Sequence, residues 1–162
     1  MDKYNPKVAT YMSIIGCGAG QLYNQQILKG ISFVLVGTYF NLKANLNEAI
    51  LYSFLADIHI AHEILNYEWG MNYLSAFYFS MWDAYYNAYK NSYSAPPRST
   101  TAIPFITAVI FGDLGIFYNH LIYIGPIFGG IVGSLIGVLI GKIIERFIKT
   151  GIFHRRTGEV QE

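Results

Sequence analysis

The chain has 162 residues, of which 53% are hydrophobic and only 13% are charged, and its formal net charge is +1. The charged share is about half that of an ordinary soluble domain, and a nearly neutral chain lacks the basic surface that nucleic-acid binding requires. Its single cysteine, Cys17, excludes an internal disulfide framework. Together with several apolar segments, this composition predicts an all-α, multi-pass integral membrane protein of four to six spans.

The first predicted unit is a helical hairpin over residues 7–43. Two apolar segments, residues 8–22 and 31–42, flank a glycine-rich turn whose characteristic residues are Gly18, Gly20, Gln21, Tyr23 and Asn24. The turn lacks the Gly-Lys-Ser/Thr ending that phosphate-binding loops need. We therefore interpret it as a tight helix–helix turn.

The stretch GAGQLYNQQILKG resembles the glycine-rich turn of the two-transmembrane-helix domain family and of related hairpins preceding some bacterial sugar ABC-transporter permeases. The family pattern is close to P-G-L-G-Q-x-Y-x-G-x-x-x-K-G. Here Gly16-Cys17 stands where Pro is usual, and Gln25 replaces a turn glycine. In those permeases an Asp-Ala-Tyr follows a later helix, and Asp83-Ala84-Tyr85 is similar. The resemblance covers residues 1–42 and implies a membrane hairpin without catalytic residues.

The hairpin has a possible repeat near residues 102–141. A shift of 95 positions aligns Gly20, Tyr23, Asn24 and Gly30 with Gly115, Tyr118, Asn119 and Gly125. Membrane proteins built by duplication commonly keep such weak internal repeats. Four identities in a short window are also compatible with chance.

The middle of the chain, residues 47–65 and 66–90, completes an N-terminal membrane region over residues 1–91. Residues 47–65 form either a span or a helix in the membrane interface. Within them His59, His62 and Glu63 share one helix face, and two histidines with a carboxylate are possible ligands of a divalent metal. The alternative is a polar face at the membrane surface. Residues 66–90 are rich in Tyr and Trp, which gather where spans meet lipid headgroups.

A linker over residues 92–101 precedes a C-terminal membrane hairpin, residues 102–149, and a cytoplasmic tail, residues 150–162. The second helix of this hairpin, residues 121–141, carries no charge and has a glycine at every fourth position: Gly125, Gly129, Gly133, Gly137 and Gly141. Such a glycine zipper lets a second helix approach closely. Its partner is either another subunit, a second copy of the chain, or one of the chain's own spans, for instance the first helix.

Two carboxylates inside apolar surroundings, Asp83 and Asp113, are candidates for an ion path, because ionisable groups at membrane depth are costly. Capping or inter-helix hydrogen bonding is the alternative. The distribution of basic residues predicts that both termini are cytoplasmic and that the number of spans is even. Six spans satisfy this rule and are favoured; four also satisfy it if residues 47–65 and one other segment lie in the membrane interface.

These patterns predict a non-enzymatic accessory or scaffold subunit of a plasma-membrane complex, bound through glycine-mediated helix packing to other membrane proteins or to itself. No cofactor is expected. The alternative is a small ion or solute channel or transporter, as a monomer or a homo-oligomer, that uses the intramembrane carboxylates.

Overall fold

The computed structural model describes residues 4–119 and 124–158, with side chains as far as residue 150. The prediction of an all-α fold is confirmed: 85% of the structure is helix, and the described residues form no strand. The elements in chain order are α1 (Pro6–Ile15), α2 (Ala19–Tyr23), α3 (Ile27–Ala44), α4 (Leu46–Phe54), α5 (Ile58–Ile64), α6 (Tyr67–Tyr93), the 3-10 turn η1 (Ser99–Ala102), α7 (Ile103–Tyr118) and α8 (Pro126–Gly158).

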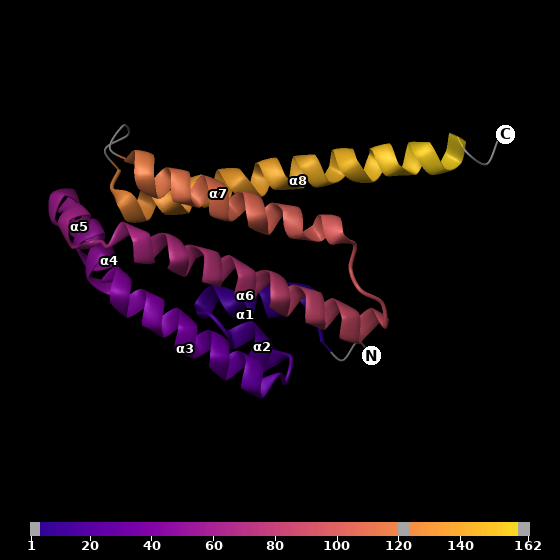
Figure 1. Ribbon diagram of the computed structural model, residues 1–162, viewed down its shortest axis with the longest axis horizontal. Coiled ribbons are helices and arrows are strands. Elements are labelled where there is room, and N and C mark those ends of the chain that lie inside the picture. The colour runs from indigo at the N-terminus through magenta and orange to yellow at the C-terminus, as the bar shows by residue number, and fades with distance from the viewer. Residues whose placement is uncertain (1–3, 120–123, 159–162) are drawn as a thin grey trace.

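Four long helices, α3, α6, α7 and α8, lie side by side and alternate in direction (Figure 1). The short helices α1 and α2 pack against α6, and α2 also packs against the start of α3. The α4–α5 pair lies at the end of the bundle opposite the chain termini (Figure 1). The closest pairing of helices is that of α7 with α8.

Local sequence explains where several helices begin. The Asn5 side chain accepts hydrogen bonds from the backbone N–H groups of Lys7 and Val8 at the start of α1, and the Asn66 side chain caps α6 in the same way. These side chains satisfy N–H groups that have no partner in the first helical turn. Asn45 ends α3 in the left-handed conformation, with φ +52°.

Two predicted segments are broken. The expectation of one span over residues 8–22 is wrong, because the chain turns at Gly16–Gly18 and α2 folds back on α1. Gly18 has φ +90°, a conformation that favours glycine. Residues 47–65 are likewise divided into α4 and α5, at a turn in which Ala56 has φ +60°. In contrast, residues 67–90 lie in the single continuous helix α6, and Asn66 is its N-cap.

Two stretches of the described chain are long and apolar enough to cross a membrane, Ser99–Tyr118 and Pro126–Thr150, with mean hydropathies of 1.7 and 2.2. They correspond to the predicted C-terminal hairpin and weakly support membrane association. Helix α8 begins at Pro126, so Gly125 precedes it; residues 121–123 of the predicted helix lie outside the described residues.

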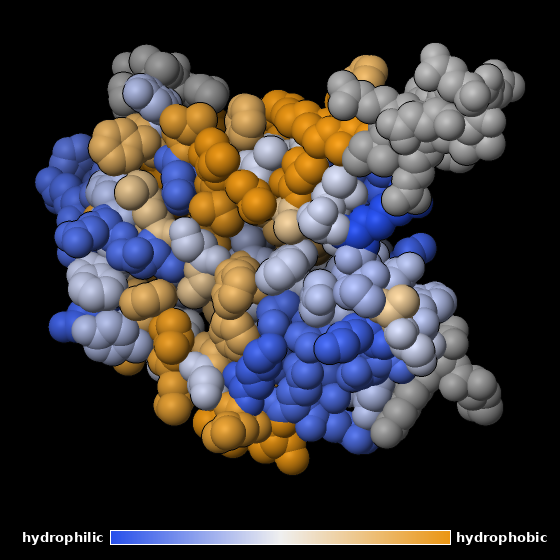
Figure 2. All heavy atoms as spheres, turned by 45° about the vertical axis from the view of Figure 1, so that its right-hand side comes forward, coloured by the Kyte–Doolittle hydropathy of each residue, from blue (hydrophilic) through white to orange (hydrophobic). Residues whose placement is uncertain are grey.

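The interior consists mainly of small or polar residues, whereas large apolar residues are on the outside. The largest fully buried side chains are Gln21, Asn119, Pro126, Ser13 and Ser80. Large apolar side chains are exposed along α1, α3, α7 and α8. On the face drawn in Figure 2, apolar residues form patches on the upper and lower parts. This distribution is the reverse of that in a soluble protein, whose largest buried residues are Leu, Ile, Val and Phe.

Candidate functional site

A buried polar cluster joins the glycine-rich turn to α6. The Gln21 side chain is fully buried, and its Nε2 donates to the Ser80 carbonyl oxygen at 2.8 Å and to Asp83 Oδ2 at 3.0 Å. Ser80 Oγ donates to Gln21 Oε1 at 3.2 Å and accepts from the Gly18 backbone N–H at 3.0 Å. The backbone donor exposed by the break between α1 and α2 is therefore satisfied by a side chain of α6.

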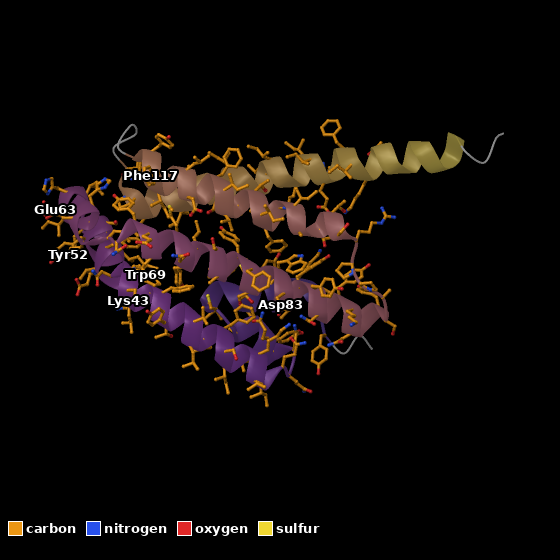
Figure 3. The ribbon with its side chains drawn as sticks, viewed as in Figure 1. Lys43, Tyr52, Glu63, Trp69, Asp83 and Phe117 are labelled. Atoms are coloured by element: carbon orange, nitrogen blue, oxygen red, sulfur yellow. The ribbon has the colours of Figure 1, made fainter. Side chains whose placement is uncertain are left out.

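The charge of Asp83 is neutralised within this cluster. Its side chain, labelled in Figure 3, belongs to a residue that is only 7% exposed. Lys29 Nζ, from the first turns of α3, lies 2.6 Å from Asp83 Oδ1, and Asn87 Nδ2 donates to the same oxygen at 3.1 Å. Both carboxylate oxygens therefore have donors, which is how proteins retain a buried carboxylate.

The rest of the turn is held by α6 and by the N-terminus. Asn24 Nδ2 donates to the Ala84 carbonyl oxygen at 2.8 Å. Tyr23 Oη accepts from the Asn5 backbone N–H at 3.2 Å, and its ring meets that of Tyr4 edge-on with 6.1 Å between centroids. A Cβ at Gly20 would lie 2.6 Å from the Ala84 Cβ, so only glycine allows this approach.

The structure thus brings together two motifs that the sequence places about 60 residues apart: the turn residues Gly18, Gly20, Gln21, Tyr23 and Asn24, and the Asp83-Ala84 pair. Sequence analysis missed Ser80 and Lys29 as members of the cluster. Lys29 offered a signal, because a lone lysine in an apolar segment needs a counter-ion. Ser80 offered none, since a serine in a long helix most often has no tertiary role.

The glycine stripe of α8 packs against α7. A Cβ at Gly129, Gly133 or Gly137 would collide with the backbone carbonyl oxygens of Gly115, Phe111 and Thr107, respectively. A Cβ at Gly141 would lie 2.5 Å from the Pro104 Cα. The partner is therefore α7 and not the first helix, and these four glycines are covered within the chain.

Gly125 does not belong to this stripe. It precedes α8 with φ +82°, and a Cβ there would lie 2.8 Å from the Ile58 Cδ1. It allows the turn that leads into Pro126, beside α5. Gly125 fits the four-residue spacing in the sequence, but it takes no part in the contact between α7 and α8.

Asp113 lies half-buried in the middle of α7, separate from the polar cluster. Its Oδ1 is buried and has no hydrogen-bond partner. No described interaction joins it to Asp83, so the two candidate ion-path residues do not form one pathway of contacting groups.

The candidate metal ligands are divided between two contacts. His59 Nδ1 lies 3.6 Å from Glu63 Oε1 on the exposed surface of α5, whereas the His62 ring contacts the Tyr67 hydroxyl. Among the described residues, no group of three or more His, Cys, Asp or Glu side chains is placed to hold a metal ion. The geometry thus places His59 and Glu63 together on the surface of α5 and gives His62 a contact between α5 and α6.

Comparison with known proteins finds no matching family model, no matching curated protein and no matching solved structure. The resemblance of residues 1–42 to the two-transmembrane-helix family stays a prediction. The function is therefore inferred from the geometry alone.

Proposed function

We propose that this chain is a small multi-pass membrane protein that crosses a plasma membrane four times, with α7 and α8 as its apolar spans and α3 and α6, which lie outside those two apolar stretches, as two further crossings. In this proposal it serves as a non-enzymatic accessory or scaffold subunit of a membrane complex. The observation that carries the proposal is the reversed distribution of side chains, with small and polar residues inside and large apolar residues outside. Lipid removes the cost of exposing apolar side chains, and small residues then favour close helix packing.

Helix α3 shows the reversed distribution of side chains most clearly. Its buried residues are Gly30, Gly37 and Ala44, one every seventh position. Apolar side chains cover its outside, with Leu28 81% exposed and Leu35 64% exposed. In water these side chains would form an exposed patch of the kind that soluble monomers rarely carry. In a bilayer the same apolar side chains contact lipid tails, which are also apolar.

The broken N-terminal segment also suits a membrane. Helix α1 has 10 residues and α2 has 5, so each is too short to cross the hydrocarbon core, which takes about 20 residues. A turn at membrane depth is tolerated only where protein satisfies its polar backbone groups. Ser80 supplies such a partner to Gly18, which supports a re-entrant α1–α2 pair.

Charge supports an orientation with both termini in the cytoplasm. The N-terminus, the end of α6 and the outer part of α8 lie at one end of the bundle (Figure 1). In the sequence these segments and the link after α6 contain Lys7, Lys90, Arg98, Lys142, Arg146 and Lys149. The opposite end, at α4, α5 and the start of α6, carries mainly carboxylates. Basic residues gather on the cytoplasmic side of membrane proteins. Six crossings would need residues 8–22 and 47–65 as spans, and both are broken.

The surface for a partner must lie outside the glycine stripe, because α7 covers it. Helix α8 has 33 residues, so it is about 50 Å long and exceeds the roughly 30 Å hydrocarbon core. Its outer part exposes Ile143 and Phe147 next to basic residues. This part provides a cytoplasmic docking surface for a partner subunit, and the outer face of α3 provides an intramembrane one.

Native mass spectrometry of the tagged protein, gently extracted from its own membrane, tests the proposal. Larger co-purifying subunits are expected, and loss of these subunits on Phe147→Asp would assign the docking surface to α8. The matched control is Thr150→Asp, which places the same charge on the same part of α8. Leu114→Asp on the exposed side of α7 would not serve as a control, because it places a charge in a span. A bare monomer, extracted under conditions that preserve known complexes of the same membrane, would contradict the scaffold proposal.

Asp113 favours a second candidate function, a small ion or solute transporter. Its buried carboxylate oxygen has no hydrogen-bond partner in a helix long enough to cross a membrane, and such a residue commonly marks an ion or proton path. Proton flux into proteoliposomes tests this function. Flux from the original protein that is lost in Asp113→Asn would favour transport over the scaffold role. Equal rates for protein-containing and empty vesicles would exclude proton transport.

A further inference from the structure

An apolar groove separates α6 from α8 in the half of the bundle opposite the chain termini. Its volume is about 590 Å³, and its walls come from α1, α4, α6, α7 and α8, including Leu46, Leu74, Met81, Ile116, Ile127 and Val138. None of its lining residues carries a charge. An uncharged, apolar ligand is the chemistry that these walls match.

The length of the groove matches one leaflet of a bilayer. Its lining runs from Gly70 to Met81 on α6 and from Pro126 to Val138 on α8. At 1.5 Å per residue these stretches are about 16–18 Å long, and half of a 30 Å hydrocarbon core is about 15 Å.

The groove is elongated, with about 590 Å³ of space over this length. Its lining side chains are mostly apolar, so a single flexible hydrocarbon chain can lie along it.

The headgroup class follows from the charges at the adjacent end of the bundle. That end carries Glu48 in the first turn of α4, Asp57 at the start of α5 and Glu68 in the first turn of α6, together with Glu63. Lys43, in the last turn of α3, is the one Lys or Arg that the described residues place there, and His59 and His62 lie on α5 (Figure 3). An anionic headgroup would be repelled by these carboxylates, and one with an ammonium group would be attracted.

We propose that the groove binds one acyl chain of a zwitterionic phospholipid in the leaflet opposite the chain termini. This inference rests on the proposed membrane insertion. The bound chain fills the space between α6 and α8 and completes the packing of the N-terminal helices against the C-terminal hairpin. Gly70 leaves room for it, because a Cβ there would meet only the Leu65 side chain, at 3.6 Å.

Photo-crosslinking tests the proposal on the full chain. The protein is reconstituted into vesicles of phosphatidylethanolamine and phosphatidylglycerol that contain a phosphatidylethanolamine with a mid-chain diazirine, and labelled residues are mapped by mass spectrometry. We expect labels at Met81 and Ile131, which line the groove. A matched phosphatidylglycerol probe is expected to label them several-fold less.

A pair of variants supplies the control. Leu135 lines the groove and is 61% exposed, whereas Leu139, one helical turn further along α8, is 62% exposed and does not line it. Leu135→Trp is expected to remove most of the label from Met81, and Leu139→Trp to leave it unchanged.

The outcomes separate this inference from the proposed function. Labels on exposed residues of α3 but not on Met81, or an unchanged Met81 label in Leu135→Trp, would overturn the acyl-chain site while supporting membrane insertion. Equal labelling by both probes would overturn the headgroup assignment. No label anywhere on α3, α7 or α8 would overturn membrane insertion itself.

Discussion

The two hairpins of this chain, α1–α2 with α3 and α7 with α8, begin from similar sequence cues but are held by different interactions. Each has a glycine followed by Tyr and Asn before its second long helix, at Gly20, Tyr23 and Asn24 and at Gly115, Tyr118 and Asn119. In the C-terminal hairpin the two helices touch backbone to backbone along glycines. In the N-terminal hairpin the first helix is broken, and hydrogen bonds to α6 fix the break. Close packing makes the C-terminal hairpin self-contained, whereas the N-terminal hairpin depends on a third helix.

Gly133→Leu should have the largest effect, because its side chain would collide with the backbone of α7 at Phe111 and Gly115. We expect unfolding to become easier by about 3 kcal/mol, or the protein to misfold. The free energy of unfolding in mixed dodecyl maltoside and SDS micelles measures this effect.

The matched control is Val132→Leu, on the exposed side of the same turn, which should change stability by less than about 0.5 kcal/mol. Similar stabilities for the two variants would show that α7 and α8 are not in backbone contact.

Asp83→Leu should come next, since it removes the partner of Lys29 and leaves the Gln21 amide buried with fewer acceptors. We expect a loss of about 2 kcal/mol in the same unfolding assay. Asp83→Asn keeps an acceptor for the Gln21 amide, so this variant should lose less stability than Asp83→Leu.

The double variant Lys29→Met with Asp83→Leu sharpens this test. If the ion pair joins α3 to α6, the double variant should lose less stability than the two single variants added together. Additive losses would mean that the two side chains act independently.

Two buried serines compare the hairpins directly. Ser80→Ala removes the acceptor of the Gly18 N–H and should cost about 1 kcal/mol, because a buried donor loses its partner. The structure gives Ser134 Oγ, on α8, no hydrogen-bond partner, so Ser134→Ala should change stability by less than about 0.5 kcal/mol. Thermal unfolding of both variants checks the pair, and a greater loss from Ser134→Ala would reverse our account of which hairpin needs hydrogen bonds.

Tyr23→Phe should have the smallest effect. It removes the acceptor of the Asn5 N–H but keeps the ring that contacts Tyr4. Since the Asn5 N–H is exposed and can bind water, we expect a loss of about 0.5 kcal/mol. Faster hydrogen exchange at Asn5, with unchanged exchange along α7, would locate the effect in the N-terminal hairpin. Equal changes in hydrogen exchange in both hairpins would show that the two hairpins are not stabilised independently.

Sequence reasoning predicted the helical class and the use of most of the glycine stripe in helix packing. It did not predict the partner of that stripe, because a four-residue spacing identifies the bare face of a helix and not the helix that meets it. The break at Gly16–Gly18 was hidden by an apolar composition that suits a continuous span equally well. The turns at Asn45 and Ala56 use residues other than glycine at positive φ, so they gave no clear signal.

The candidate cluster was predictable only in parts. The turn residues and Asp83 stood out individually, since a glycine-rich turn and a carboxylate in an apolar segment are both unusual. Their meeting depends on how α6 crosses the first hairpin, which is set by tertiary packing of small residues such as Ala84 and Ala88. Local pattern carries no information about that crossing.

The dependence of the Gly18 turn on Ser80 also sets an order for membrane insertion during synthesis. The two residues are 62 positions apart, so the ribosome must make the first half of α6, as far as Ser80, before the turn can reach its acceptor. Until then the α1–α2 pair stays near the lipid headgroups, where water can hydrate its backbone. Nascent chains arrested before Ser80 should therefore keep residue 18 accessible to water-soluble reagents, and chains arrested well after it should bury that residue. The α1–α2 pair, although made first, would enter the bilayer only once α6 is present to receive it.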